Sequence, residues 1–328
     1  MEFIYVGAGL VLLLIGGEAL IRGAVSLAEN WGVSKLVIGL TVVAFGTSAP
    51  ELLVSLSAVH DGAPGIAIGN VVGSNIANIL LVLGAPALIM PFICTMDTMR
   101  SEGVAMLAAT IMMIVVCWLN GLSFWAGLIF FLALCAFLYN AYVQARKSGD
   151  ETLAHATEEF EDGMPKSPIK AALWILVGLA GLVLGSELLV DGARTIAKDL
   201  GLSDAVIGVT LVAIGTSLPE LATSVVAAFR RHGDVAIGNV IGSNLFNILG
   251  ILGITSMVAD IPVPVQMLEF DLWVMLAAAV ILFPLAFFKI PVGRVVGILF
   301  LVAYGSYMYA QFTGISGMPV EQMSALIQ

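Results

Sequence analysis

The chain has 328 residues, of which 60% are hydrophobic and only 11% are charged, and its mean hydropathy is +1.05. A soluble domain carries roughly 25% charged and about 45–50% apolar residues, so the excess apolar surface is expected to face lipid. The formal net charge of −10 excludes the basic face that nucleic-acid binding requires. Three cysteines lie in apolar runs without metal-ligand spacing, which disfavours a disulfide framework or a zinc site: Cys94, Cys117 and Cys135.

Apolar segments of about 20 residues, each long enough to cross about 30 Å of hydrocarbon, recur along the chain. The sequence predicts ten such helices, near 3–23, 36–58, 65–88, 103–120, 124–144, 171–191, 204–228, 234–257, 270–288 and 294–313. The first helix has no basic segment before it and no small-residue cleavage site, so we interpret it as a retained span and not as a signal peptide.

A charged stretch separates two halves of five helices each. It is predicted to be an acidic cytoplasmic linker over residues 146–170, between a first repeat at 1–145 and a second at 171–328. If both termini lie outside, 11 of the 13 basic residues fall in inside loops, and only Arg194 and Lys198 remain outside. Because positive charge accumulates on the cytoplasmic side, we expect a multi-pass protein of the inner (plasma) membrane with both termini outside.

The two halves share an internal repeat. Residues 39–51 (GLTVVAFGTSAPE) recur as residues 208–220 (GVTLVAIGTSLPE), at an offset of 220 − 51 = 169. The same offset relates residues 69–78 (GNVVGSNIAN) to residues 238–247 (GNVIGSNLFN). Since five spans is an odd number, the second copy enters the membrane from the opposite side. The sequence therefore predicts an all-α integral membrane protein of ten transmembrane helices in two inverted-topology repeats, with a binding site at the midplane.

The first repeated segment ends in a motif that brings oxygen atoms together. Pro50 frees the carbonyl of Gly46, so the helix is expected to kink there, and irregular backbone at membrane depth is tolerated where it lines a cavity. Thr47 and Glu51 are four residues apart and share a helical face with their oxygens. We call this the glutamate motif; it supplies Thr47, Ser48 and Glu51 from the first half and Thr216, Ser217 and Glu220 from the second.

The second repeated segment contains Gly-Ser-Asn-x-x-Asn, which we call the asparagine motif. Its hydroxyl and amide oxygens are placed three and four residues apart, and the candidates are Ser74, Asn78, Ser243 and Asn247. Helix–helix hydrogen bonding adequately explains Asn75 and Asn244. The same offset pairs Glu18 with Glu187, which sit beside Arg22 and Arg194 as snorkelling charges or as parts of gates.

These ligands suit a hard cation. Calcium takes about 6–8 oxygen ligands, and two glutamates carry the charge that matches one divalent ion. Sodium could use the same oxygens, whereas a soft transition metal would prefer thiolate or imidazole. The three histidines fall in loops, at His60, His155 and His232. Proton, sodium and calcium are thus the candidate ions, and the neutral oxygen ligands favour calcium or sodium.

The two glutamate motifs, the two asparagine motifs and the layout of five plus five spans resemble the calcium/cation antiporter superfamily. Within it, the sequence is similar to the sodium/calcium exchangers, and to the prokaryotic members related to potassium-dependent exchangers. The resemblance covers essentially the whole chain. It implies four cation positions at mid-membrane.

The resemblance also implies a ligand for each position. The calcium ligands would be Thr47, Glu51, Thr216 and Glu220. The sodium ligands would add hydroxyls and two carbonyls, with two asparagines at the centre: Ser48, Ser74, Ser217, Ser243, the carbonyls of Ala44 and Ala213, Asn78 and Asn247. Several members have an aspartate at the position of Asn247, and this aspartate is associated with potassium dependence. The amide here gives the site one fewer potential charge.

The sequence therefore predicts a secondary active antiporter that exchanges sodium for calcium by alternating access. A proton-coupled cation exchanger using the same glutamates is the alternative, and a passive cation channel is a weaker one, because an inverted repeat is typical of carriers. No nucleophile–base pair is visible, so we do not expect an enzyme or a cofactor. The expected partners are inorganic cations and the lipid bilayer, without nucleic acid or an obligate protein partner.

Overall fold

The computed structural model describes residues 2–31, 38–60, 62, 64–93, 99–119, 121–147, 167–199 and 213–313. In these ranges the ordered elements are helices, apart from isolated β-bridges joining Phe92 to Val292 and Leu122 to Ile261. Cys94, most of the predicted linker and the first part of the predicted span 204–228 lie outside the described residues.

Six described helical stretches are long and apolar enough to cross a membrane, and a bent pair can form a seventh. The six are Phe3–Ala28, Pro64–Ile89, Phe124–Ala141, Pro168–Leu189, Gly233–Val258 and Met267–Phe287, and the bent pair is Gly39–Thr47 with Ala49–His60. These helices agree with the predicted class of an all-helical membrane protein.

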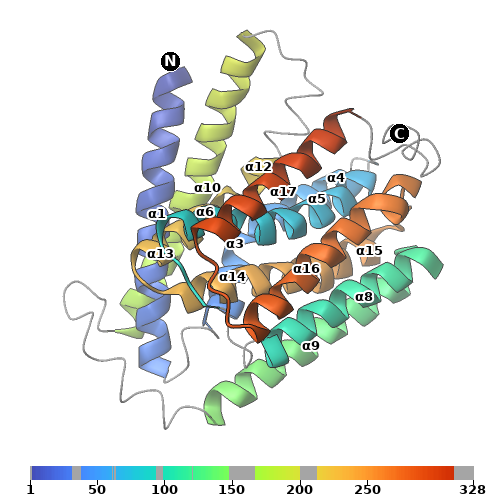
Figure 1. Cartoon of the computed structure of the whole chain (residues 1–328), viewed down its shortest axis with the longest axis horizontal. Helices are drawn as coiled ribbons and strands as arrows, with labels where there is room; N and C mark the ends of the chain where they lie inside the picture. Colours follow the sequence, from blue (N-terminus) through green and yellow to red (C-terminus); the bar gives the residue numbers. More distant parts are fainter. Residues whose placement is uncertain are drawn as a thin grey trace.

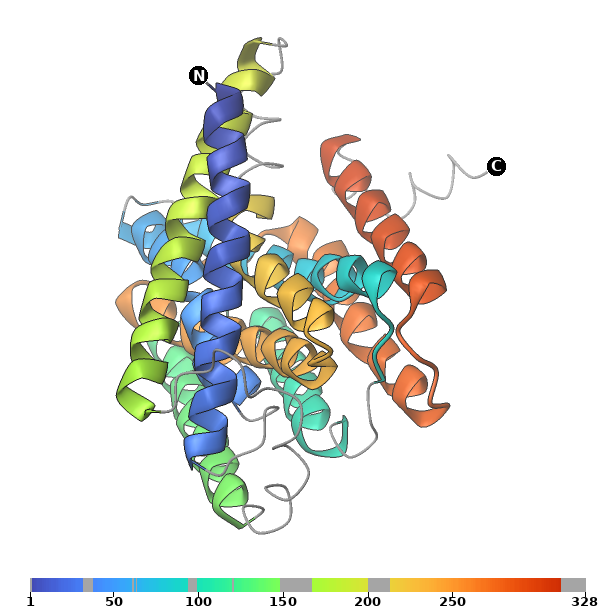
Figure 2. The same ribbon diagram turned by 90° about the vertical axis from the view of Figure 1, so that its left-hand side faces the viewer.

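Two long helices, α1 (Glu2–Trp31) and α10 (Pro168–Asp199), lie side by side along one edge of the molecule (Figures 1 and 2). They pack backbone to backbone where glycines face each other. A Cβ atom added to Gly16 would lie 2.9 Å from the carbonyl oxygen of Gly178, and one added to Gly178 would lie 2.8 Å from that of Gly16. Small residues permit this close approach between membrane helices.

The glutamate and asparagine motifs lie on short, interrupted helices in the middle of the molecule. In the first half these are η1 (Gly39–Val43), α3 (Ala44–Thr47), α4 (Ala49–His60), α5 (Pro64–Ala77), η2 (Asn78–Val82) and α6 (Gly84–Ile89). In the second half they are α12 (Ala213–Thr216), α13 (Leu218–Phe229), α14 (Gly233–Leu245), η5 (Phe246–Ile251) and α15 (Leu252–Val258). Both ends of α4 and α13 differ by 169, as 218 − 49 and 229 − 60 show.

The remaining helices pack against motif helices or equivalent helices of the other half. They are η3 (Met99–Gly103), α8 (Val104–Leu119) and α9 (Phe124–Lys147), and η6 (Met267–Asp271), α16 (Leu272–Phe287) and α17 (Arg294–Thr313). Helix α9 of the first half packs on α15 of the second, α17 of the second packs on α6 of the first, and α8 packs on α16. The two β-bridges tie together the loops beside these exchanged contacts.

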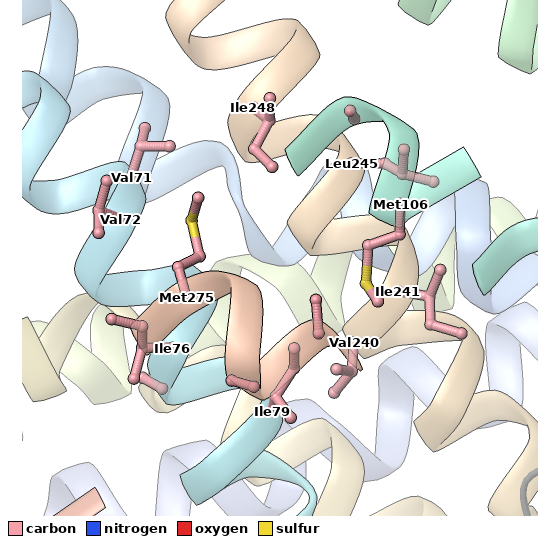
Figure 3. Packing of buried hydrophobic residues seen from close by; sticks show 14 of the residues in the cluster. Val71, Val72, Ile76, Ile79, Met106, Val240, Ile241, Leu245, Ile248 and Met275 are labelled. Carbon is pink, nitrogen blue, oxygen red and sulfur yellow. The ribbon is translucent and has the colours of Figure 1, made fainter. Parts of the chain in front are cut away.

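The helices that carry the asparagine motifs build an apolar core of matched residues together with α8 and α16 (Figure 3). None of ten core side chains is more than 1% exposed, and they form five pairs 169 residues apart: Val71 and Val240, Val72 and Ile241, Ile76 and Leu245, Ile79 and Ile248, and Met106 and Met275. Such a tightly packed surrounding holds polar side chains in fixed positions.

Candidate cation site

The two motif glutamates are buried at equivalent positions. Glu51 lies in the first turn of α4 and Glu220 in the first turn of α13, and each is only 1% exposed. The two motifs are in contact, since Ser48, three residues before Glu51, donates to Glu220. The positive end of a helix stabilises a carboxylate in its first turn by about 0.3–1 kcal/mol, which falls far short of the desolvation penalty of two buried like charges. A bound cation would supply the missing compensation.

The helix breaks that position these glutamates have the same geometry in both halves. Ser48 has φ −85° and ψ 6°, and Ser217 has φ −87° and ψ 3°. The first break bends the chain by 47°, which confirms the predicted kink beside Pro50. The chain does not unwind, however, because the amide of Leu52 donates to the carbonyl of Ser48 at 3.2 Å.

The carbonyls near the breaks are partly engaged. The Ala44 carbonyl, a candidate ligand, accepts the Ser48 amide at 3.0 Å and the Thr47 hydroxyl at 3.4 Å. In the second half, Pro219 frees the carbonyl of Gly215, and the hydroxyl of Ser186 donates to it at 2.6 Å. The sequence position 169 residues before Ser186 is a glycine, so the first half has no equivalent hydroxyl. Ala213, the other candidate carbonyl, begins α12.

Most predicted ligand side chains are brought together in the buried centre. Ser48 donates to Oε1 of Glu220 at 3.0 Å, which links the motif of one half to the glutamate of the other. Six further motif oxygens are buried without a hydrogen-bond partner: Glu51 Oε2, Glu220 Oε2, Ser217 Oγ, Ser243 Oγ, Asn78 Oδ1 and Asn247 Oδ1. Thr47, Ser74 and Thr216 are buried as well. Buried polar atoms are normally satisfied, and a set made only of oxygens suits a hard cation.

A pair of amide hydrogen bonds orients the central asparagines. Asn78 Nδ2 donates to Asn244 Oδ1 at 3.0 Å, and Asn247 Nδ2 donates to Asn75 Oδ1 at 3.2 Å. Because both amide nitrogens are committed, Oδ1 of Asn78 and Oδ1 of Asn247 are left to face a ligand. Asn75 and Asn244 form hydrogen bonds between helices, as the sequence indicates, and these bonds also fix the orientation of the two candidate ligands.

Sequence reasoning missed three polar residues next to the glutamate motifs. Asn70 Nδ2 donates to the carbonyl of Glu51 at 3.1 Å and to Ser55 Oγ at 3.0 Å, while Asn239 Oδ1 accepts from Thr47 at 3.3 Å. A signal was present, because Asn70 and Asn239 belong to the ungapped repeat and Ser55 follows Glu51 by one helical turn.

Glu18 connects two elements and does not merely snorkel. Its carboxylate accepts from Arg22 on the same helix and from Arg230 at the end of α13. This three-residue group ties α1 to the core. Glu187, its partner in the repeat, is exposed on α10.

A helical membrane protein whose buried centre gathers carboxylate, hydroxyl and amide oxygens from two similar halves has the architecture of a cation carrier. Comparison with known families makes this specific. The chain matches the family described as "Sodium/calcium exchanger protein" over residues 1–143 and 170–313, and it belongs to this family. The family consists of transporters and not of enzymes.

Individual relatives match over nearly their full length. The sodium/calcium exchanger MaX1 of Methanosarcina acetivorans is 32% identical, covering 95% of this chain and 99% of the relative. The membrane protein MJ0091 of Methanocaldococcus jannaschii is 39% identical, covering 90% and 93%. A solved structure of the sodium-calcium exchanger NCX_Mj superimposes with a TM-score of 0.81 at 35% identity, covering 94% and 98%.

Proposed function

We propose that this protein is a sodium/calcium antiporter that works by alternating access. The observation that carries the proposal is the pair of buried glutamates, Glu51 and Glu220, surrounded by buried oxygens without partners. The family match and the names of MaX1 and NCX_Mj support sodium and calcium as the transported ions. Both ions act as substrates, and no cofactor is required.

The proposal includes an architecture of ten transmembrane helices in two inverted repeats. The repeats would be residues 1–145 and 171–328, joined by an acidic cytoplasmic linker at 146–170. Matched helix bounds, matched breaks at Ser48 and Ser217 and the exchanged helix contacts favour this arrangement. The distribution of Lys and Arg favours an inner-membrane orientation with both termini outside. Lipid is the expected surrounding, and no protein partner is required.

We assign ion ligands to the motif residues. Calcium would be held by Thr47, Glu51, Thr216 and Glu220. Sodium ions would use the neighbouring hydroxyls and carbonyls, with the asparagines at the centre: Ser48, Ser74, Ser217, Ser243, Ala44, Ala213, Asn78 and Asn247. The direct hydrogen bond between Ser48 and Glu220 supports a shared site for both ions. Since calcium and sodium need the same two carboxylates, one displaces the other.

Transport into vesicles of purified protein tests this function. With sodium inside and calcium outside, we expect rapid calcium uptake, and replacing internal sodium with choline should abolish it. Collapsing any pH gradient should leave uptake unchanged, because the proposed coupling ion is sodium. Uptake that persists with choline inside and disappears with the pH gradient would instead support proton coupling.

Two variants and a control test the site. Glu51→Gln and Glu220→Gln each remove one of the two charges that compensate calcium, so we expect uptake to fall at least about 100-fold, corresponding to about 3 kcal/mol or more. Asp271→Asn is the matched control, since Asp271 is also a membrane carboxylate, 4% exposed, but is hydrogen-bonded to Tyr307 and Gln311. Equal losses in all three variants would contradict the assignment.

A further inference from the structure

Two equivalent asparagine–serine pairs flank the site, and they behave differently in the two halves. Asn70 and Ser55 of the first half correspond to Asn239 and Ser224 of the second, since 239 − 70 and 224 − 55 both equal 169. In the first half, Asn70 Nδ2 donates to Ser55 Oγ at 3.0 Å and to the Glu51 carbonyl at 3.1 Å. This pair therefore ties α5 to α4 at the turn that carries Glu51.

The second pair lacks the matching bonds. Asn239 Nδ2 and Ser224 Oγ are both buried without a hydrogen-bond partner, and both residues are 0% exposed. Asn239 instead uses its Oδ1, which lies 3.3 Å from the hydroxyl of Thr47 in the other half; the alternative acceptor of that hydroxyl is the Ala44 carbonyl at 3.4 Å. Unsatisfied buried polar atoms are unfavourable. The two asparagine–serine pairs are identical in sequence, but only the first pair is hydrogen-bonded. This difference indicates that each pair has two arrangements, bonded and unbonded, and that the structure shows one pair in each.

The central amides do not share this difference, whereas the glutamate motifs do: Ser48 donates to Glu220 Oε1 at 3.0 Å, but Ser217 Oγ and Glu51 Oε2 have no hydrogen-bond partner. At the centre, the bond from Asn78 to Asn244 and the matching bond from Asn247 to Asn75 are both present, at 3.0 and 3.2 Å. The asymmetric hydrogen bonds therefore flank a symmetric pair of central amide bonds, and they can change without rearranging those amides.

Burial around the two pairs differs in the same sense. Asn70 is half-buried, whereas its counterpart Asn239 is 0% exposed, and every residue of α14 from Val235 to Leu245 is buried. The bond between Thr47 and Asn239 thus lies among fully buried residues. In the other pair Asn70 is less covered, although its partner Ser55 is 0% exposed.

We propose that these residues form an exchangeable hydrogen-bond switch that positions the two glutamates and seals one side of the site at a time. In the opposite access state, Asn239 would donate to Ser224 and to the Glu220 carbonyl, and Asn70 would release Ser55 and accept from Thr216. Asn70, Asn239, Ser55 and Ser224 are positioning residues that need not touch the ion. This inference rests on the proposed alternating-access function, because it requires two access states.

Hydrogen–deuterium exchange of the purified full-length protein tests the switch without any transport measurement. The ratio of exchange in residues 64–73 to exchange in residues 233–242 reports which side is open. Ser55→Ala removes a bond made only in the present state, so the ratio should fall about three- to tenfold. Ser224→Ala removes a bond made only in the opposite state, so the ratio should stay or rise, and the double variant should return toward wild type.

Conservative variants separate this switch from a merely structural role. Ser55→Thr and Ser224→Thr keep a hydroxyl, so each should keep the wild-type ratio. Equal shifts in both alanine variants, or additive loss of thermal stability without a change in the ratio, would overturn the switch. A second structure in the opposite access state offers a direct check, and it overturns the switch if Ser224 still lacks Asn239 as a partner. The exchange measurement does not depend on which ions are transported. Failure of the proposed sodium/calcium coupling and failure of the switch are therefore distinguishable.

Discussion

Under the proposed ligand assignment, Asn75 and Asn244 would contribute to ion binding through the residues that they orient. Each accepts a hydrogen bond from the side-chain amide of a central asparagine, at 3.0 Å for Asn78 and 3.2 Å for Asn247. The side-chain oxygen of that asparagine is thereby left free to face the ion. Binding sites depend on such supporting hydrogen bonds for the orientation of their ligands. A residue of this kind can be essential for affinity without contacting the ion.

Replacing Asn244 with alanine should therefore weaken ion binding. The variant leaves Asn78 Nδ2 without its acceptor in a buried site, so we expect about 1–2 kcal/mol of lost affinity, or roughly five- to thirtyfold. Titration of calcium binding by calorimetry measures this loss. Thr255→Val is a suitable control, because Thr255 is buried but its hydroxyl contacts only backbone carbonyls one turn earlier, those of Ile251 at 2.6 Å and Leu252 at 3.4 Å. A similar loss of affinity in both variants would argue against an orienting role.

At the scale of elements, the contact between α1 and α10 depends on the absence of side chains. The crossing at Gly16 and Gly178 brings backbone atoms of one helix against those of the other. A methyl group there has no flexible neighbour to displace, because the atoms it would meet are backbone. The two helices would have to separate to accommodate it.

Gly16→Ala should accordingly destabilise the protein by about 1–3 kcal/mol and slow transport. Thermal unfolding in detergent and the initial rate of calcium uptake are the measurements. Gly7→Ala is a matched control on the same helix, because a Cβ at Gly7 meets nothing within 4 Å. An equally tolerant response at both positions would show that the close packing of these helices is dispensable.

The sequence predicts single elements better than the contacts between them. The kink at Ser48, the burial of Glu51 and Glu220 and the apolar span Pro64–Ile89 all follow from local chemistry, namely proline geometry and apolar runs. The partners of Ser186, Asn239 and Glu18 do not, because each contacts a residue distant in the sequence. The repeat shows that two positions are equivalent, but it does not show that Asn70 and Asn239 make different bonds.

At the scale of the whole molecule, orientation in the membrane can be tested directly. With both termini outside, 11 of the 13 basic residues face the cytoplasm. Alkaline phosphatase fused after Gln328 should be active, because this enzyme folds only outside the cytoplasmic membrane. A fluorescent protein fused after Lys147 should fluoresce, because that position is predicted to be inside. The opposite pattern in both fusions would reverse the proposed topology.

Exchange without leak is the property that the buried carboxylate pair should impose on the whole carrier. An empty site would bury two negative charges when it closes, whereas a site filled by calcium is neutral, so only the filled carrier should change access readily. The burial of Glu51 and Glu220 to 1% exposure makes this difference large.

Calcium on the far side should therefore be able to replace sodium. Vesicles loaded with unlabelled calcium, and free of sodium, should take up radioactive calcium by one-for-one exchange, whereas vesicles loaded with choline alone should not. After each labelled ion is released inside, the binding site must face outward again before it can bind another. The rate of label entry therefore measures this return step, which should require a bound ion that neutralises the site. Label entry at equal rates into both kinds of vesicle would mean that the empty site crosses freely, as a channel or a uniporter would allow, and the two carboxylates would then not enforce exchange.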